Sequence, residues 1–331
     1  MKTAVVILNW NGKKLLETYL PTVVAHSKEA TIYVADNAST DDSVAYVTSK
    51  FPTVKIIQNT TNGGYAKGYN EALKHLDEDL LVLLNSDVAV TENWLTPVFT
   101  AFQNNKNLAA AQPKILDDKN KTHFEYAGAA GGFIDALGYP YCRGRIFNTI
   151  EEDKGQYNDT TTIFWATGAC LFIRNTDFKK VGGFDQSFFA HQEEIDLCWR
   201  LHGLEKEVKY IGTSTVYHLG GATLETQNPK KTFYNFRNSL LMMVKNIPGL
   251  KVIPLLFIRM VLDSIAAFQL LLQAKPLHFF AVLKSHFSFY YMLPGCLAKR
   301  RQIKKQKDYA TLRSIVWQYF INRKRFYNDL N

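Results

Sequence analysis

Short apolar runs alternate with amphipathic segments over the first hundred residues. Four runs of apolar or β-branched residues occupy positions 3–8, 31–35, 54–57 and 80–84. Segments with helical periodicity, such as KKLLETYLPTVVA and DDSVAYVTSKF, lie between them. Strands that alternate with helices build parallel sheets covered on both faces, so the pattern predicts an α/β fold.

Each apolar run ends in a polar, turn-prone cluster. The clusters are Asn9-Trp10-Asn11-Gly12, Asp36-Asn37-Ala38-Ser39, residues 59–64 and Asn85-Ser86-Asp87. Ligands bind outside the carboxyl ends of the strands in open parallel sheets. We therefore expect the four clusters to gather at one ligand-binding edge.

Two of these clusters carry acids that suit a nucleotide. Asp87 follows a buried run, and a carboxylate held there can coordinate a divalent cation that bridges two phosphates. Asp36 can accept hydrogen bonds from a ribose or a base, and Asn62-Gly63-Gly64 lets the backbone approach a nucleotide closely. The alternative is that Asp36 and Asp87 only cap the helices that follow them.

After residue 240 the pattern changes to long apolar stretches. Residues 252–272 contain Arg259 and Asp263 near their middle, and residues 277–297 contain Lys284. Charges are costly in hydrocarbon, so we expect helices that lie in the membrane interface rather than cross the bilayer. A buried helical subdomain with a solvated basic face is the alternative.

The charge of the chain is concentrated in the same region. The 331 residues carry a net charge of +9, and residues 230–331 hold 18 Lys and Arg against three Asp and Glu. This imbalance indicates a polyanionic partner, either membrane lipid or nucleic acid. We expect an anionic membrane surface and no nucleic acid, because no groove-reading or base-stacking module accompanies the basic cluster. Each basic residue near an anionic membrane contributes about 1 kcal/mol to the free energy of binding. The basic cluster consists of Lys299, Arg300, Arg301, Lys304, Lys305 and Lys307.

Cysteine usage and the N-terminus favour a cytosolic protein. The four cysteines, at positions 142, 170, 198 and 296, form no CxxC pair and are expected to be reduced. The apolar run before Asn9 is too short for a secretory signal and is expected to be the first strand.

Seven motifs occur in order along residues 1–240. They are VVILNWNG, ADNASTDDS, NTTNGGYAKGYN, LLNSDV, ATGACLFIR, GGFDQSFFAHQEEIDLCWR and YHLGG. The chain resembles inverting family 2 glycosyltransferases of the rhamnosyltransferase-like, bacterial surface-glycan type. The resemblance implies the GT-A fold, which is a Rossmann-like, mostly parallel sheet flanked by helices.

The resemblance also implies a donor site that uses Mg²⁺ or Mn²⁺. Asn85-Ser86-Asp87 matches the D-x-D-like metal motif, with Asp87 as the metal ligand, and His218 matches a second ligand. For a lone histidine after a strand, a structural role is the alternative. Asp36 matches the acid that reads the base, in a loop with Asn9 and Asn11.

The catalytic base is expected in HQEEID. An inverting transfer needs a carboxylate that takes the proton of the acceptor hydroxyl. The resemblance places this base at Glu194, where the family usually has Asp, and Glu193 is the alternative. Without the resemblance, these acids indicate only the first turn of a helix, where the helix dipole favours negative charge. Arg200 is expected either to help hold the diphosphate or to form an ion pair on the helix surface.

The segment GYPYCRGRIF is expected to be a loop. Its Arg143 and Arg145 either contact a phosphate of a lipid-linked acceptor or form a solvated pair.

We expect three parts in the chain. Residues 1–115 bind the nucleotide-sugar, residues 116–240 hold the acceptor and the base, and residues 241–331 associate with the membrane. The predicted reaction transfers a sugar from a UDP- or dTDP-sugar to a lipid-linked glycan on the inner face of the cell membrane. A catalytically inactive, nucleotide-sugar-binding scaffold is the alternative. A nicotinamide-dependent oxidoreductase is disfavoured because GxGxxG does not follow the first run.

Overall fold

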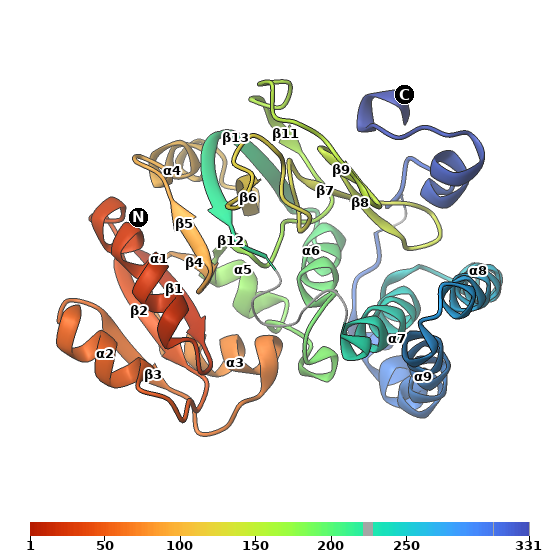
Figure 1. The fold of residues 1–331 in the computed structure, drawn as a ribbon, viewed down its shortest axis with the longest axis horizontal. Coiled ribbons are helices and arrows are strands. Elements are labelled where there is room, and N and C mark those ends of the chain that lie inside the picture. The colour runs from red at the N-terminus through yellow and green to blue at the C-terminus, as the bar shows by residue number, and fades with distance from the viewer. Residues whose placement is uncertain (221–227, 307, 331) are drawn as a thin grey trace.

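The computed structural model describes residues 1–220, 228–306 and 308–330. Gly221 of YHLGG and Lys307 of the basic cluster therefore lie outside the described residues. A nine-stranded sheet with helices on both faces forms the body of the molecule, and three long helices stand at one end of it (Figure 1).

The first third of the chain forms the predicted parallel layer. β1 pairs in parallel with β2 and β4, and β2 pairs in parallel with β3. The strands lie close to the predicted runs and end one residue further on. The elements are β1 (Thr3–Asn9), α1 (Lys13–His26), β2 (Thr31–Asp36), α2 (Ser43–Lys50), β3 (Lys55–Gln58), α3 (Gly64–Leu73), β4 (Leu80–Asn85), β5 (Val88–Val90) and α4 (Leu95–Asn104).

The middle of the chain completes the sheet. Its strand order is β11-β13-β6-β12-β4-β1-β2-β3, and β5 pairs with β13. β12 runs antiparallel between β4 and β6, whereas β13 is parallel to β6. The sheet is therefore mixed but mostly parallel. The added elements are β6 (Leu108–Asp117), β11 (Thr160–Thr162), β12 (Cys170–Arg174), α5 (Asn175–Lys180), α6 (Glu193–Gly203) and β13 (Glu207–His218).

A second, small antiparallel sheet lies beside the first. It consists of β7 (Gly132–Ile134), β8 (Pro140–Cys142), β9 (Arg145–Ile146) and β10 (Thr149–Ile150). The prediction of a loop for residues 138–147 is therefore wrong. Both arginines of this segment are buried: Arg143 pairs with Asp159 at 2.5 Å, and Arg145 lies 4.1 Å from the ring centre of Tyr126. They are neither a solvated pair nor free to bind phosphate.

The apolar runs are continuous because both faces of the sheet are covered. In β1, Ala4 and Val6 face the core that contains α3 and α6, while Val5 and Ile7 face the core that contains α1 and α4. All four side chains are buried. Such a strand can place polar residues only at its end, which is where the ligand edge begins.

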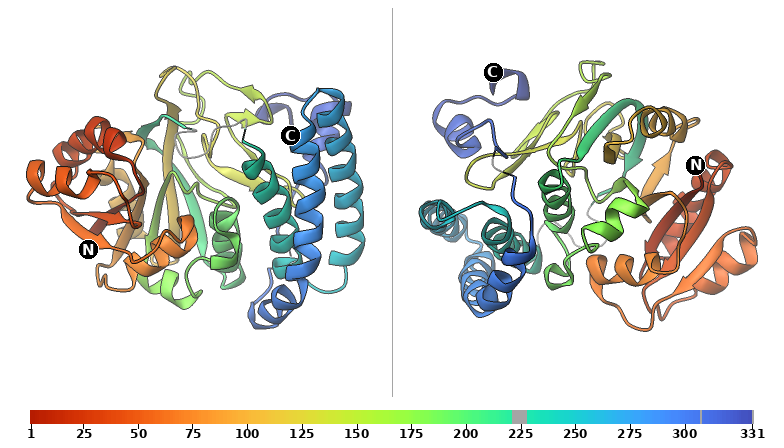
Figure 2. Two further views of the ribbon diagram at one scale, coloured as in Figure 1. Left: turned by 60° about the horizontal axis from the view of Figure 1, so that its bottom comes forward. Right: turned by 180° about the vertical axis from the view of Figure 1, so that it is seen from behind.

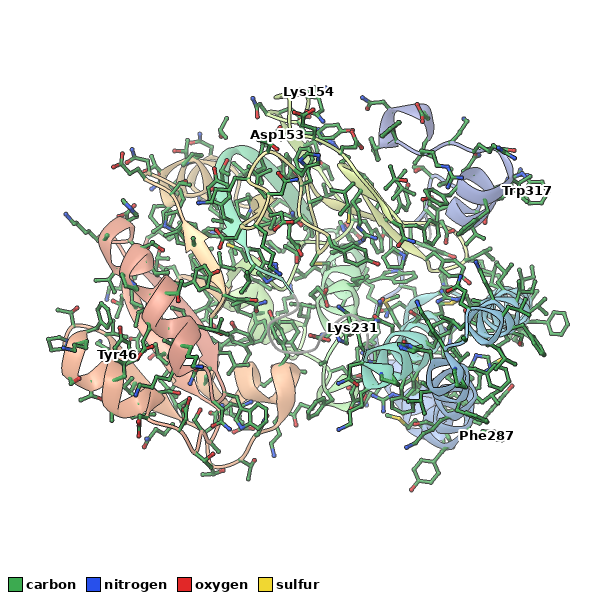
Figure 3. All side chains as sticks on the ribbon, in the orientation of Figure 1. Tyr46, Asp153, Lys154, Lys231, Phe287 and Trp317 are labelled. Atoms are coloured by element: carbon green, nitrogen blue, oxygen red, sulfur yellow. The ribbon has the colours of Figure 1, made fainter. Side chains whose placement is uncertain are left out.

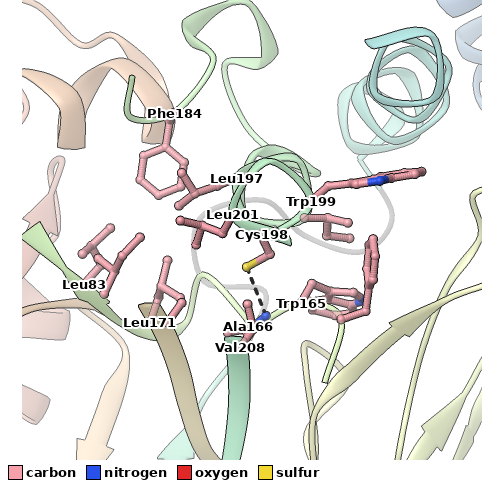
Figure 4. Close-up of a cluster of buried hydrophobic side chains, with 14 of the residues drawn as sticks. Leu83, Trp165, Ala166, Leu171, Phe184, Leu197, Cys198, Trp199, Leu201 and Val208 are labelled. Atoms are coloured by element: carbon pink, nitrogen blue, oxygen red, sulfur yellow. Dashed lines mark hydrogen bonds between the residues drawn. The ribbon is translucent and has the colours of Figure 1, made fainter. Parts of the chain in front are cut away.

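Helix α6 is anchored on the sheet by its apolar face. Leu197 and Leu201 are fully buried in the cluster with Leu83 of β4 (Figure 4). On the same helix, the Cys198 thiol accepts a hydrogen bond of 3.5 Å from the amide of Ala166. These contacts fix the first turn of α6, which carries the predicted base.

The C-terminal helices are α7 (Pro229–Asn246), α8 (Val252–Leu272) and α9 (Pro276–Gln302). α7 runs through residue 240, where the sequence pattern placed a boundary, and packs against α6, α8 and α9. Figure 2 shows the three helices side by side at the end of the molecule opposite α1 and α2. α7 therefore joins the catalytic body to the two apolar helices.

A buried ion network makes this joint. Asp196 is fully buried and accepts hydrogen bonds from Arg200 (2.9 Å), Lys245 of α7 (2.7 Å) and Asn246 of α7 (2.8 Å). Lys245 also bonds Asp185, at 2.7 Å. Burial acts to raise the pKa of Asp196, but the charges of Lys245 and Arg200 outweigh it and hold the pKa below its ordinary value.

Replacing Asp196 with Ala leaves the cations of Arg200 and Lys245 buried without their shared carboxylate. We expect the free energy of unfolding to fall by about 3–5 kcal/mol. Urea denaturation followed by circular dichroism measures this change. Glu205→Ala, which removes an exposed pair with Lys304, is the control and should leave the midpoint unchanged. Equal midpoints for the two variants would contradict the prediction.

Candidate functional site

The ends of β1, β2 and β4 lie side by side at one edge of the sheet. Asn9 is in register with Asp36, and Leu8 is in register with Asn85. The carboxylate of Asp36 is buried and accepts hydrogen bonds from the Asn9 amide group (3.2 Å) and from the Ser39 backbone (3.0 Å). The buried Oδ1 of Asn9 has no hydrogen-bond partner. The edge therefore presents a fixed carboxylate beside a free acceptor.

Neither acid of this edge caps a helix. Asp36 bonds the Ser39 amide inside a loop, whereas α2 begins at Ser43. Asp87 is followed by strand β5. The capping alternative is therefore wrong for both residues.

Asn11 shapes the loop after β1. Its backbone has a positive φ of 48°, and its side-chain oxygen accepts a hydrogen bond of 2.7 Å from the Thr40 amide. The backbone amide of Asn11 donates a hydrogen bond to the Ser39 hydroxyl at 2.9 Å. Asn9 and Asn11 thus join the loops after β1 and β2, with the exposed Trp10 between them.

The glycines before α3 face the protein itself. Asn62 accepts hydrogen bonds from Asn37 and from the Gly64 amide, each at 3.0 Å, and Gly63 precedes the helix. A Cβ on Gly64, which has φ +71°, would lie 2.6 Å from the Phe189 carbonyl oxygen. That oxygen accepts the Tyr65 amide at 2.9 Å. The close approach predicted for a nucleotide is made here by the loop that leads into α6.

Asp87 and His218 lie together, as predicted. The imidazole Nε2 is 3.2 Å from Asp87 Oδ1, and Nδ1 is 3.3 Å from Glu125 Oε2. All three side chains are buried. Burial acts to lower the pKa of His218, but its contacts with the two carboxylates outweigh this and raise the pKa to about 10. The histidine is therefore a cation between two carboxylates.

Glu125 is a site residue that the sequence analysis missed. It follows the bridge between Leu116 and Phe124, and its amide donates to the Ile115 carbonyl. Gly220 approaches so closely that a Cβ there would lie 2.7 Å from Glu125 Oε1. HFEYAG has no recognisable spacing, so only the tertiary fold brings this acid to His218.

Glu193 and Glu194 open α6, directly after a strained loop. Phe189, His191 and Gln192 have positive φ values of 64°, 70° and 72°. One carboxylate oxygen of each glutamate is buried and has no hydrogen-bond partner. Buried groups are normally paired, so two unpaired carboxylates side by side indicate a site that receives a ligand.

Burial raises the pKa of both glutamates. It raises that of Glu194 to about 7, and burial together with the Glu194 charge raises that of Glu193 well above its ordinary value. An acidic first turn of the ordinary kind stays ionised because the helix dipole and water favour the anion. Here burial outweighs the dipole, so the alternative of a merely dipole-favoured turn does not describe these residues.

Arg200 lies outside this group. Its guanidinium donates to Asp196 and to the carbonyl oxygens of Val181 (2.5 Å) and Gly183 (2.7 Å). It is buried, so the prediction of a surface ion pair is wrong. All three of its nitrogens donate to Asp196 or to these carbonyl oxygens, so its hydrogen bonds hold the protein together rather than face a diphosphate. The i, i+4 spacing from Asp196 was the signal for this pairing.

Lys231, at the start of α7, is the cation near the site. Burial lowers its pKa, and the Glu125 charge opposes that shift. The Lys231 charge in turn helps burial to lower the pKa of His191 to about 4. Lys231 therefore lies between the His218 group and the loop into α6, near the middle of the molecule (Figure 3).

A mostly parallel sheet with polar strand ends at one edge, and carboxylates on a helix beside it, is the arrangement expected of a GT-A glycosyltransferase. The sequence profile of glycosyl transferase family 2 matches residues 4–182, more than half of the chain. The chain therefore belongs to glycosyl transferase family 2 and is a glycosyltransferase, as the motifs predicted.

Curated relatives are of the surface-glycan type. An N-acetylglucosaminyl-diphospho-decaprenol L-rhamnosyltransferase of Mycobacterium tuberculosis is 24% identical over 233 residues, which are 65% of this chain and 75% of that protein. Rhamnosyltransferase WbbL of Escherichia coli is 25% identical over 167 residues, 48% of this chain and 62% of that protein.

Solved structures share the fold. The mannosyltransferase PcManGT of Pyrobaculum calidifontis, in complex with GDP-Man and Mn²⁺, aligns with a TM-score of 0.54 at 12% identity, covering 88% of this chain and 87% of that one. S. aureus TarS 1–349 in complex with UDP aligns at 0.52 and 15% identity, covering 77% and 70%. The predicted GT-A fold is confirmed.

The charge on His218 can be tested directly. Glu125→Ala removes one of its two carboxylates, so the pKa of His218 should fall by roughly 1–3 units. NMR titration of the imidazole protons measures it. Glu152→Ala, which changes an exposed acid of the same chain, should leave the titration unchanged. A wild-type His218 that titrates near 6.5 would contradict the assignment.

Proposed function

We propose that the chain is a metal-dependent inverting glycosyltransferase that uses a UDP- or dTDP-sugar. The observation that carries this proposal is the pair of buried, unpaired carboxylates of Glu193 and Glu194 at the start of α6. An inactive scaffold, the alternative, has no need for buried carboxylates with raised pKa values, because burying them costs stability.

The donor nucleotide binds at the edge formed by β1, β2 and β4. Asp36 with Asn9 and Asn11 receives the base and the ribose, and Asn62, Gly63 and Gly64 close the far side of this edge. Support comes from the buried Asp36 carboxylate and from the unpartnered Asn9 oxygen, which can accept a hydrogen bond from a ligand. Lys231, rather than Arg200, supplies positive charge for the diphosphate.

The divalent metal, Mg²⁺ or Mn²⁺, binds at Asp87 and His218. Among the described residues no three His, Cys, Asp or Glu side chains form a closed metal cage. His218 would have to give up its proton to bind the metal, because only a neutral imidazole is a metal ligand. One carboxylate and one neutral imidazole suit these ions, because substrate phosphates and water usually complete their coordination. The buried His218 Nδ1 faces Glu125, an arrangement that orients ligand histidines in many metal sites. The bound metal would neutralise charge on the leaving diphosphate.

Glu194 is the base. Its carboxylate takes the proton of the acceptor hydroxyl while that oxygen attacks the anomeric carbon, and the bond from this carbon to the diphosphate breaks on the opposite face. A pKa of about 7 suits a base at neutral pH, and Glu194 is less buried than Glu193. Glu193, whose pKa is also raised by burial and by the Glu194 charge, remains the alternative.

The acceptor is a glycan on a lipid carrier, reached from the cytoplasmic face of the membrane. The Mycobacterium tuberculosis relative, whose name gives a sugar on diphospho-decaprenol as its acceptor, supports this class of acceptor. Residues 1–115 bind the donor, residues 116–240 hold the acceptor and residues 241–331 bind the anionic membrane surface. One described helix, α8, is long and apolar enough to cross a membrane.

Donor binding is tested by thermal stability. We expect Mn²⁺ with UDP or dTDP to raise the melting temperature of the wild type, because a ligand of the folded state stabilises it. Asp87→Ala should abolish the metal-dependent part of the shift, whereas Asp117→Ala, a nearby acid outside the group, should keep it. A wild type that no nucleoside diphosphate stabilises would contradict the donor site.

The base is tested by the pH dependence of transfer. Only ionised Glu194 can accept a proton, so kcat/KM should rise with pH through about 7 and level off above it. Glu194→Gln should lower kcat by about 10²–10⁴-fold while the nucleotide still binds. Glu193→Gln is the matched control variant, and its kcat should fall far less than that of Glu194→Gln. A larger loss in Glu193→Gln would move the base to that residue.

A further inference from the structure

The outer face of α8 and α9 is apolar and exposed. Phe257 and Phe268 of α8 are 71% and 61% exposed, and Phe287 of α9 is 77% exposed. Other exposed apolar side chains of the two helices are Ile253, Ile258, Val261, Ile265, Leu272, Leu277, Phe280 and Tyr291. Soluble proteins rarely expose an apolar surface of this extent without a partner.

The inner face of the same helices is polar and pinned to the body. Arg259 donates to Asp263 (2.9 Å) and to the Gly138 carbonyl (3.2 Å) in the turn between β7 and β8. Tyr139 donates to Asp263 at 3.2 Å, and His286 of α9 lies 3.5 Å from it. If α8 crossed the bilayer it would lose these partners and carry Arg259 and Asp263 into hydrocarbon. An α8 that keeps these contacts does not cross the bilayer.

The C-terminal segment adds a second apolar group. Ile315 and Tyr319 are buried against the small sheet, where the Ile315 amide donates to Asp135 at 2.8 Å. The single π-helical turn Trp317–Ile321 turns its other side chains outward, and Trp317 is 59% exposed. Phe320 and Ile321 are exposed beside it, and Arg323-Lys324-Arg325 follows. An exposed tryptophan next to basic residues is typical of membrane interfaces.

Both groups lie at one end of the molecule. Trp317 and Phe287 are on the side away from the donor half in Figure 3, and Figure 2 shows α8, α9 and the C-terminus at the same end. Residues 230–331 contain only three acids, of which Asp263 is buried. The end therefore combines apolar side chains with an excess of positive charge.

We propose that this end, formed by α8, α9 and the segment from Trp317 to Arg325, is a membrane-docking face that inserts into one leaflet of an anionic bilayer, with Trp317 as a separate anchor. The proposal rests on the membrane association in the proposed function and gives it a geometry. A second copy is a poorer occupant, because residues 230–331 carry 18 basic residues against three acids, and two such ends would repel each other.

Tryptophan quenching by brominated phospholipids tests the proposal. Of the five tryptophans, Trp94, Trp165 and Trp199 are buried, and Trp10 lies at the donor edge. Vesicles of brominated phosphatidylcholine and phosphatidylglycerol should therefore quench Trp317. We expect Trp317→Phe to lose most of the quenching and Trp10→Phe to keep it. Equal quenching in the wild type and in Trp317→Phe would overturn the assignment of this anchor.

A second pair of variants tests the helices. Phe257→Glu with Phe268→Glu should lose most co-sedimentation with the anionic vesicles. Thr18→Glu with Thr48→Glu, which adds the same charge to exposed positions of α1 and α2, should keep it. Equal binding of the wild type to uncharged vesicles would overturn the role of anionic lipid. A dimer in the absence of vesicles that the Phe variants abolish would assign the face to a second copy.

The same variants separate this inference from the donor site. The thermal shift with Mn²⁺ and nucleotide should be unchanged in all the vesicle-binding variants except Trp10→Phe, whose residue borders the donor edge. Loss of lipid binding with a normal nucleotide shift supports the docking face. Normal lipid binding without any nucleotide shift contradicts the donor site alone.

Discussion

The arrangement of the site depends on the ion pairs that the buried Asp196 carboxylate makes. This carboxylate accepts hydrogen bonds from Arg200 of α6 and Lys245 of α7. Lys245 also donates to Asp185, which connects the network to the loop before α6. Two and three residues earlier on the same helix, Glu194 and Glu193 each have a buried carboxylate oxygen without a hydrogen-bond partner, and no salt bridge to a cation among the described residues. One environment lowers a carboxyl pKa and the other raises it, although all three acids share one helix end. Proteins assign different chemical roles to neighbouring acids in this way. The network stabilises the helix and so allows the glutamates to remain unpaired.

A second constraint joins the two halves of the site. The Phe189 carbonyl oxygen accepts a hydrogen bond from the Tyr65 amide at the start of α3. Only a glycine at position 64 leaves room for this carbonyl. The loop into α6 is thereby fixed against the donor edge, with Tyr65 donating to the Gly168 carbonyl at 2.8 Å beside it. The positive φ values of Phe189, His191 and Gln192 are the cost of that fit. The strain lies where the donor half meets the predicted base, as expected for a functional loop.

The sequence predicted what local patterns determine. Buried parallel strands are visible in a sequence as continuous apolar runs. The polar residues that end these strands lie at one edge because parallel strands all end on the same side of the sheet. The proximity of Asp87 and His218 came from the family motifs and is present in the structure. The sequence did not predict Glu125 as a site residue because no local motif surrounds it. Its place in the site depends on its contact with His218, which lies far along the chain. For Arg200 the sequence left a diphosphate contact and a surface ion pair open, because the i, i+4 spacing from Asp196 indicates a pair but does not reveal that both side chains are buried. Arg143 and Arg145 were misread because small strands in a glycine-rich segment have no period to detect.

The turn between β7 and β8 links the C-terminal helices to α6. Its carbonyls hold Arg259 of α8, while the neighbouring Phe133 carbonyl accepts a hydrogen bond of 2.8 Å from Trp165. Trp165 precedes Ala166, whose amide bonds Cys198 in the middle of α6. The path runs through the turn between β7 and β8 and through the segment between β11 and β12, and each of its contacts is a hydrogen bond. The contacts therefore fix α6 relative to α8, so that the carboxylates at the start of α6 and the apolar helices keep one relative position.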